Sequence, residues 1–206
     1  MLHQSENVTF KESGDKMIEV QYLHNLSRSE VAFTKALFEL MEKKNYTSIT
    51  IRELAITADY DRKTFYRHFS SKEDILKLYC SNILREMAIM EKELGTLTFY
   101  TGIVSYFRFW QQHKNFLYLL EEHDLLYFLE SNHVELIYEY VGREVQPEIP
   151  INLTQAQNFS KYSVLFTFGG LWSILIHWIE NKCQETPEEL TEYVLDFFKQ
   201  SINFLR

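Results

Sequence analysis

Residues 46–72 read YTSITIRELAITADYDRKTFYRHFSSK and carry the most informative pattern in the chain. Two short segments with helical spacing of apolar residues, 51–58 and 62–69, flank a break at Asp59. Helices this short bury too little surface to be stable alone, so we predict that both pack on a third helix that begins at Ser27. The stretch therefore predicts a three-helix unit with a helix-turn-helix at its centre.

Capping-box patterns mark four helix starts. Each pairs a Ser or Thr with a Glu three positions later, so that the hydroxyl accepts from an amide of the first turn and the carboxylate accepts from the cap amide. The four pairs are Ser27/Glu30, Thr50/Glu53, Ser70/Glu73 and Thr186/Glu189. Because an apolar stretch of helical period follows each pair, all four predict the beginning of a helix.

The rest of the chain reads as further helices with few breaks. No alternating strand pattern occurs, and residues 142–152, which contain two prolines, are predicted to form the main loop. The predicted fold class is all-α. Helices are expected over residues 27–44, 51–58, 62–69, 70–90, 99–112, 115–122, 124–141, 152–180 and 186–205.

Composition supports a folded helical chain with a segregated charge. Of the 206 residues 46% are hydrophobic, and only six Gly and three Pro occur, which excludes disordered, collagen-like and loop-rich sandwich proteins. Aromatic residues reach 16%, so we expect a core built of rings.

The formal charge of −8 argues against a nucleic-acid binder if the whole chain is considered. However, residues 27–72 carry nine Lys and Arg against six acidic residues, whereas residues 73–206 have a net charge of −9. The basic region is the one that carries the helix-turn-helix.

A membrane or disulfide-stabilised protein is not indicated. Residues 162–179 form an 18-residue run without a formal charge, but several polar side chains interrupt it, so we expect a helix buried in protein. Cys80 and Cys183 lack the spacing of a zinc site, and the N-terminal residues lack the apolar segment of a signal peptide. We therefore predict a cytoplasmic protein with no membrane contact.

The second helix of the pair carries the side chains that groove recognition requires. A helix-turn-helix places its second helix in the major groove, where Arg62 and Lys63 can bond guanine edges and Thr64 can contact a base. The remaining predicted contacts, mainly to phosphates, are Thr50, Tyr66, Arg67, His68 and Lys72. On charge alone these basic side chains would be assigned to a solvated surface.

The same stretch closely resembles the DNA-binding domain of TetR-family transcriptional regulators, through IRELA (51–55), ADYD (58–61), TFYRHF (64–69) and SKEDI (71–75). This resemblance implies a homodimer that binds double-stranded DNA at a palindromic operator, with Thr50, Arg62, Lys63, Thr64, Tyr66, His68 and Lys72 at the usual contact positions. It further implies a repressor that an effector releases. Asp59 stands where the family usually has Gly, and because Asp tolerates left-handed backbone we expect a slightly strained turn.

The remaining helices resemble the family's variable regulatory domain. Residues 168–190 are similar to the branch that includes regulators of dihydroxyacetone kinase genes, with Lys182 in place of a Gly. The expected divisions are a weakly ordered arm (1–26), the DNA-binding domain (27–72) and an effector-binding and dimerisation domain (73–206). The dimer interface is predicted at Gly169, Gly170, Leu171, Trp172, Leu175, Trp178, Val194 and Phe197. A cavity for a small hydrophobic or aromatic effector is predicted at Phe107, Trp110, Tyr118, Tyr127 and Phe128, although each ring singly fits the core better.

No catalytic residue, metal site or cofactor is predicted. His113, His123 and His133 form no metal-binding pair on one helical face, and neither a Gly-rich phosphate loop nor a nucleophile elbow occurs. Three alternatives stay open. The uncharged helix can be an ordinary buried helix of one subunit, the regulator can respond to a partner protein, or the chain can be a helical enzyme or ligand carrier with a vestigial helix-turn-helix.

Overall fold

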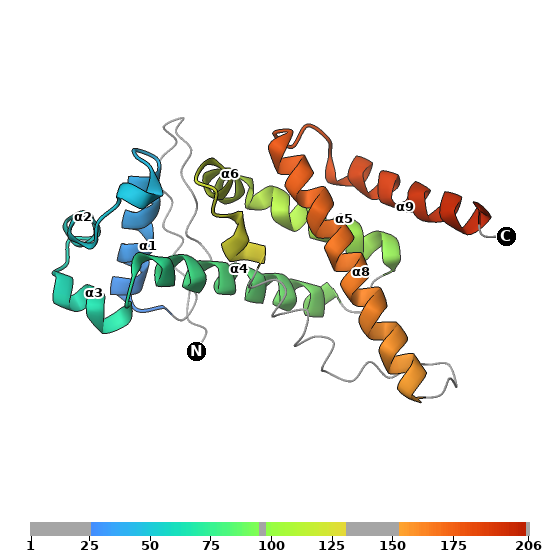
Figure 1. The fold of residues 1–206 in the computed structure, drawn as a ribbon, viewed down its shortest axis with the longest axis horizontal. Coiled ribbons are helices and arrows are strands. Elements are labelled where there is room, and N and C mark those ends of the chain that lie inside the picture. Colours follow the sequence, from blue (N-terminus) through green and yellow to red (C-terminus); the bar gives the residue numbers. More distant parts are fainter. Residues whose placement is uncertain (1–25, 95–97, 131–152, 205–206) are drawn as a thin grey trace, which may run out of the picture.

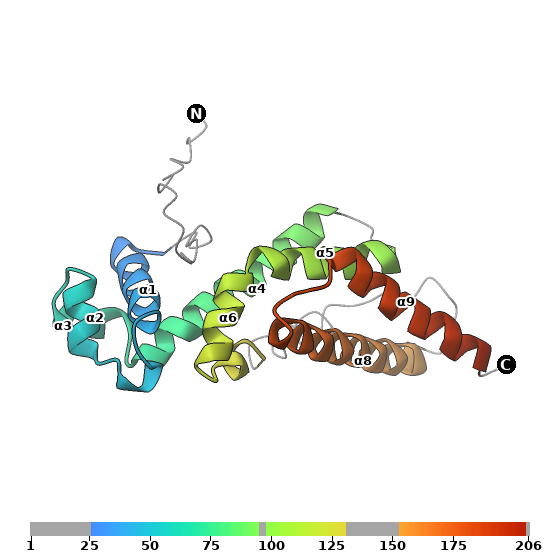
Figure 2. The same ribbon diagram turned by 90° about the horizontal axis from the view of Figure 1, so that it is seen from above.

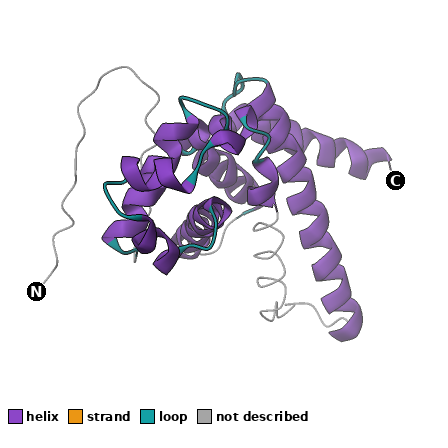
Figure 3. Ribbon diagram, turned by 60° about the vertical axis from the view of Figure 1, so that its left-hand side comes forward, coloured by secondary structure: helices purple, strands orange, loops and turns teal. Residues whose placement is uncertain are grey.

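The computed structural model describes residues 26–94, 98–130 and 153–204, and all regular structure within them is helical (Figure 3). Its elements are α1 (Arg28–Met41), the 3-10 helix η1 (Tyr46–Ser48), α2 (Ile51–Thr57), α3 (Arg62–His68), α4 (Lys72–Leu94), α5 (Phe99–Gln112), α6 (Lys114–Glu122), α8 (Leu153–Glu180) and α9 (Pro187–Phe204). Residues 126–130 begin a further helix. The all-α prediction is confirmed, whereas the predicted main loop and nearly all of the N-terminal arm lie outside the described residues.

Helices α1, α2 and α3 form a small bundle at one end of the molecule, and α4 leads from it to the C-terminal helices (Figure 1). Phe33 of α1 is central to this bundle. Its ring packs edge-on against Phe65 and Phe69, at centroid distances of 5.3 and 6.1 Å, and all three side chains are buried. Burying each such ring contributes about 1.5–3 kcal/mol, so this cluster fixes α3 on α1 and leaves the opposite face of α3 outward.

Three of the four predicted capping boxes form, at Ser27, Thr50 and Thr186. The prediction at Ser70 is wrong by one residue, because the amides of Ser70 and Ser71 both donate to the carboxylate of Asp74, at 2.8 and 3.1 Å. Phe69 explains the displacement. Its backbone is extended while its ring is anchored in the core, so the chain turns into α4 one residue later, at Lys72.

The predicted turn at Asp59 is confirmed. Asp59 has a φ of 57°, and the amide of Tyr60 donates to the carbonyl oxygen of Ala55 at 3.0 Å, which closes the end of α2. Asp124 ends α6 in the same left-handed conformation, with a φ of 56°. The helix predicted from residue 124 therefore begins only at 126.

Helices α5 and α9 pack along each other in the C-terminal half, on the side of the molecule away from α2 and α3 (Figure 2). The guanidinium of Arg108 on α5 donates to the Glu188 carboxylate of α9 at 2.8 Å, and Phe107 packs on Trp178 of α8 at a centroid distance of 6.0 Å. Within the described ranges no helix is long and apolar enough to cross a membrane. The uncharged run instead contributes Leu175 and Trp178 to the protein core, as predicted.

Candidate nucleic-acid interface

Helix α3 has one face buried against α1 and the other turned to solvent. Asp61 starts it, because its carboxylate accepts from the amide of Thr64 at 2.6 Å, and this bond lowers the pKa of Asp61. Phe65 occupies the buried face. The outward residues are Arg62, Lys63, Tyr66 and Arg67, which are exposed, and Thr64, which is half-buried. Five predicted contact residues thus share the outward face of one short, capped helix.

Arg62 and Tyr66 form a pair on this outward face. They lie one helical turn apart, and the Arg62 guanidinium is 5.9 Å from the centroid of the Tyr66 ring, which is itself half exposed. The attraction between cation and ring restricts the long Arg side chain before any ligand arrives. A guanidinium held in this way offers a planar set of donors that matches the acceptors of a guanine edge.

Thr50 lies at the N-terminus of α2, where the sequence predicts a phosphate contact. Its hydroxyl donates to the Glu53 carboxylate at 2.7 Å, and the other oxygen of that carboxylate binds Lys44. Hydrogen bonds from Lys44 and Thr50 lower the pKa of Glu53 to about 2. Glu53 therefore stays ionised near neutral pH, and Lys44 offsets its charge at the exposed Thr50.

His68 turns inward, away from the exposed face of α3. Its Nε2 lies 2.9 Å from the Ser29 hydroxyl and its Nδ1 lies 3.4 Å from the Glu30 carboxylate. Burial opposes ionisation of Glu30, but hydrogen bonds from Ser27 and the nearby imidazole hold its pKa below the usual value. With its side chain only 19% exposed, His68 fastens α3 to α1 rather than facing solvent.

Lys72 also faces the protein. Its ammonium group donates to the carbonyl oxygens of Tyr46, Thr47 and Ile49 at 2.7, 3.2 and 3.0 Å, and lies 4.4 Å from the centroid of the Tyr46 ring. Burial lowers the pKa of Lys72. A phosphate contact at this position would require these bonds to break. These bonds could not be predicted from the sequence, because they join positions more than twenty residues apart.

His123 has a role that sequence reasoning missed. It follows α6, and its Nε2 lies 2.9 Å from the carbonyl oxygen of Met41, while the amide of Tyr46 points at its Nδ1 from 3.5 Å. Since a carbonyl oxygen only accepts, we assign the ring proton to Nε2. The imidazole thereby joins the C-terminal half to the junction between α1 and α2.

Two stretches of the chain match known families. Residues 33–79, from α1 into α4, match the family described as bacterial regulatory proteins, tetR family. Residues 98–200, half of the chain, match the family described as transcriptional regulator C-terminal region. The chain belongs to the TetR family of bacterial regulatory proteins. The first match contains both helices of the helix-turn-helix, α2 and α3.

Part of this TetR-family chain is also similar to the uncharacterized HTH-type transcriptional regulator YxbF of Bacillus subtilis (strain 168). The two are 30% identical over 81 residues, which cover 37% of this chain and 21% of the relative. The chain thus spans about a fifth of the length of the curated relative that it matches. None of these matches carries the resemblance to regulators of dihydroxyacetone kinase genes, which stays a prediction.

None of the five residues predicted to bind an effector lines the cavity between α5 and α8 that is described below. Phe107, Trp110 and Phe128 are buried in the core, Tyr127 is 53% exposed, and the ring of Tyr118 lies under the Lys182 ammonium at 5.3 Å. The predicted set thus contains both buried and exposed rings. The number of aromatic residues in a sequence does not indicate which of them line a cavity.

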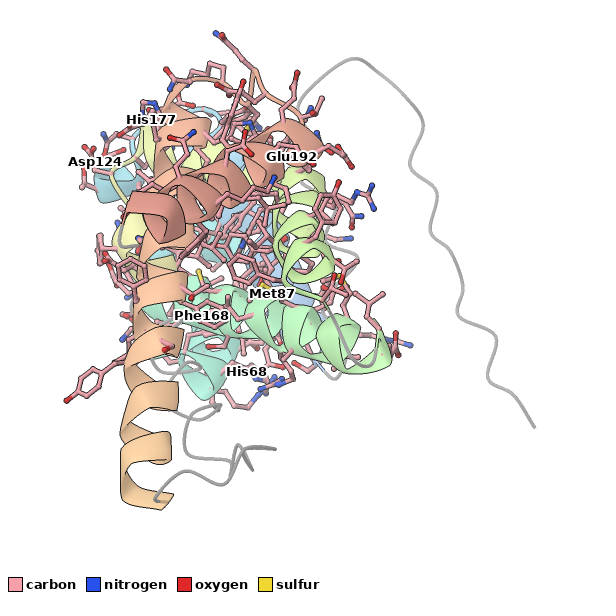
Figure 4. All side chains as sticks on the ribbon, turned by 90° about the vertical axis from the view of Figure 1, so that its right-hand side faces the viewer. His68, Met87, Asp124, Phe168, His177 and Glu192 are labelled. Carbon is pink, nitrogen blue, oxygen red and sulfur yellow. The ribbon has the colours of Figure 1, made fainter. Side chains whose placement is uncertain are left out.

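A cavity of about 350 Å³, partly open to solvent, lies instead between α5 and α8. The α5 side of its lining consists of Thr98, Phe99, Gly102, Ile103 and Tyr106, and the α8 side of Thr167, Phe168 and Leu171. Figure 4 shows Phe168 on the side of α8 that turns toward the body of the protein.

The predicted dimer residues divide between two faces of α8 and α9. Leu171, Leu175, Trp178 and Val194 are buried within the subunit, and the Trp178 indole donates to the Glu185 carbonyl oxygen at 2.9 Å. Trp172 is half-buried. Since α8 is apolar nearly all round, its sequence did not show which stripe faces inward. The predicted members that remain exposed are Gly169, Gly170 and Phe197.

Within the described part of the chain, no group of three or more His, Cys, Asp or Glu side chains could hold a metal ion. His113 is buried, and this burial lowers its pKa to about 4. His123 binds backbone groups as described above, and His133 lies outside the described residues.

Replacing Lys72 by Met tests whether this residue holds the fold or binds phosphate. We expect the free energy of unfolding to fall by about 2 kcal/mol, since three carbonyl oxygens lose a charged donor. The slope of log K against log salt for DNA binding should stay unchanged. In the control Arg67→Met, at an exposed position of α3 for which a phosphate contact is predicted, stability should persist and the slope should fall by about 0.9. A lower slope with unaltered stability in Lys72→Met would instead assign Lys72 to phosphate. Denaturant titration and binding at several salt concentrations measure both quantities.

Proposed function

We propose that this TetR-family regulator acts in the cytoplasm as a homodimeric repressor that binds a palindromic operator and is released when an effector binds its C-terminal half. The observation that carries the proposal is the outward face of α3, where Arg62, Lys63 and Tyr66 are exposed on a helix anchored by Phe65. Two such helices fit successive major grooves when a dimer places them about 34–36 Å apart. Residues 27–72 form the DNA-binding unit, and residues 73–206 form the effector-binding and dimerisation unit.

Exposed aromatic side chains on α8 and α9, here called the exposed stripe, support the proposed dimer. Tyr162 and Phe166 on α8 are 67% and 65% exposed, and Tyr193 and Phe197 on α9 are 63% and 59% exposed. Apolar rings at helical spacing on a surface are typical of an association site. On the same stripe, a Cβ added at Gly170 would meet no atom of its own subunit, which leaves room for a close helix crossing.

Contacts of α6 support transmission of an effector signal. Lys182, in the turn between α8 and α9, binds the Glu121 carboxylate of α6 at 3.2 Å, and His123 at the other side of that helix end binds Met41. A shift of α8 would therefore move α6 and, through it, the α1–α2 junction. The ligand-sized cavity beside α8 favours a small-molecule effector over a partner protein.

Sequence-specific binding depends on Arg62 in this proposal. From a random duplex library, the wild-type protein should select a palindrome. Arg62→Ala should bind that palindrome about 10- to 100-fold more weakly and accept other bases at one position of each half-site, because a bidentate guanine contact is worth about 1–3 kcal/mol. Arg85→Ala, at an exposed position of α4, is the matched control. Equal affinity and selectivity in both variants would refute the DNA-reading role of α3.

Dimerisation depends on the exposed stripe. Phe166→Glu places a charge at its centre and should convert the dimer to a monomer, since an unpaired carboxylate is costly to bury. Sedimentation velocity measures the change, and operator affinity should fall with it. Ile89→Glu, at a 52% exposed site on α4, should remain dimeric. A dimer that survives Phe166→Glu would place the interface elsewhere.

His123→Ala tests the connection between the two halves. Loss of the imidazole should raise amide hydrogen exchange over residues 41–49 and weaken operator binding about three- to tenfold, because α6 no longer holds the α1–α2 junction. Glu122→Ala changes the exposed neighbour and should alter neither measurement. Unchanged exchange in His123→Ala would show that the junction is held without α6.

A further inference from the structure

The cavity between α5 and α8 has a lining that restricts what can occupy it. Phe99, Ile103, Phe168 and Leu171 supply apolar and aromatic surface. The polar side chains that line it carry only hydroxyl groups, and among the described residues no charged side chain lines it. An ion entering this site would lose water without gaining a counter-charge, which is unfavourable, whereas a neutral ring would gain contact.

The volume sets the size of an occupant. At about 350 Å³ the cavity is at the small end of the range of ligand sites. An apolar cavity less than half as large is known to hold a benzene molecule, so two fused rings or their equivalent suit this one.

The position of the cavity connects it to the exposed stripe. Along α8, Thr167, Phe168 and Leu171 line the cavity while Phe166 and Gly169 face outward. On the α5 side, the ring of Phe99 packs edge-on against Phe198 of α9 at a centroid distance of 5.2 Å. A molecule in the cavity therefore touches the inner surface of α8 directly and is connected to α9 through the ring of Phe99.

We infer that this cavity binds a small uncharged molecule with a flat apolar body and one or two hydroxyl or carbonyl groups. The inference rests on the proposed effector control and names the ligand class of that control. The apolar walls hold the body of the molecule, and its polar groups meet the hydroxyl groups of Thr98 and Thr167, whereas the Tyr106 hydroxyl is buried. Its binding changes the packing of α8 behind the dimer stripe.

Calorimetric titration of the full chain without DNA tests the ligand class. The probes are a naphthol, the matching naphthoate and the matching naphthylmethylammonium ion, which share one ring system and differ in charge. We expect naphthol to bind at least tenfold more tightly than either ion. Absence of naphthol binding, or equal binding of all three, would overturn the inference.

Gly102→Leu tests the location. A Cβ at Gly102 meets no atom within 4 Å, so the larger side chain can fill the cavity without disturbing the helix. Naphthol affinity should fall at least tenfold while circular dichroism stays unchanged. Gln111→Leu, exposed on the same helix, should bind naphthol like the wild type. Naphthol binding that survives Gly102→Leu would overturn the assignment to this cavity.

Operator binding is measured separately, with and without naphthol. If naphthol binds the wild type but not Gly102→Leu, and operator affinity does not change, the ligand site stands and the effector step of the proposed function fails. If naphthol does not bind while the palindrome is still selected, the ligand inference fails and DNA recognition stands.

Discussion

Three backbone carbonyl oxygens, those of Tyr46, Thr47 and Ile49, converge on the ammonium group of Lys72. They belong to η1 and the residue that follows it, where the Tyr46 oxygen also accepts from the amide of Ile49 at 3.1 Å. A buried acceptor without a donor is costly, so the ammonium group stabilises this turn. Because Lys72 is the first residue of α4, this one group ties the start of the long helix to the segment that leads into α2. The placement of α2, and with it that of α3, relative to α4 depends on this contact.

Helix α6, in the C-terminal half, also contacts the region between α1 and α2. His123 binds the carbonyl oxygen of Met41, and the ring of Phe116 packs against Phe38 of α1 and Tyr79 of α4, at centroid distances of 5.6 and 4.7 Å. An apolar cluster and a polar contact thus hold α6 against α1 and α4 together. A rigid packed interface of this kind transmits a displacement rather than absorbing it, because close-packed side chains have little room to adjust. The helix-turn-helix is therefore positioned jointly by α4 and α6.

The sequence predicted the features that depend on near neighbours. Three of the four capping boxes, the inward rings of Phe65 and Phe69 and the left-handed turn at Asp59 form as expected, because they depend on residues within one or two turns. The outward face of α3 followed from the same periodicity. The inward roles of Lys72, His68 and His123 were not predictable, because their partners lie 23 to 82 positions away. The inner stripe of α8 was missed for a different reason, since a helix that is apolar all round gives no periodic signal.

The distribution of charge in the DNA-binding unit is consistent with the proposed dimer. Lys43 and Lys44 form ion pairs with Glu39 and Glu53, and the ammonium group of Lys72 donates to backbone carbonyl oxygens. Arg62 and Lys63, in contrast, make no ion pair with any described carboxylate. Three basic residues of the unit, Arg62, Lys63 and Arg67, thus share one seven-residue helix. A helix that neutralises so few phosphates releases few counterions, and a single half-site is then bound weakly. In the proposed dimer a second copy at the spacing of the next major groove would supply the missing affinity, and the exposed stripe of α8 and α9 would then matter to DNA recognition as much as α3 does.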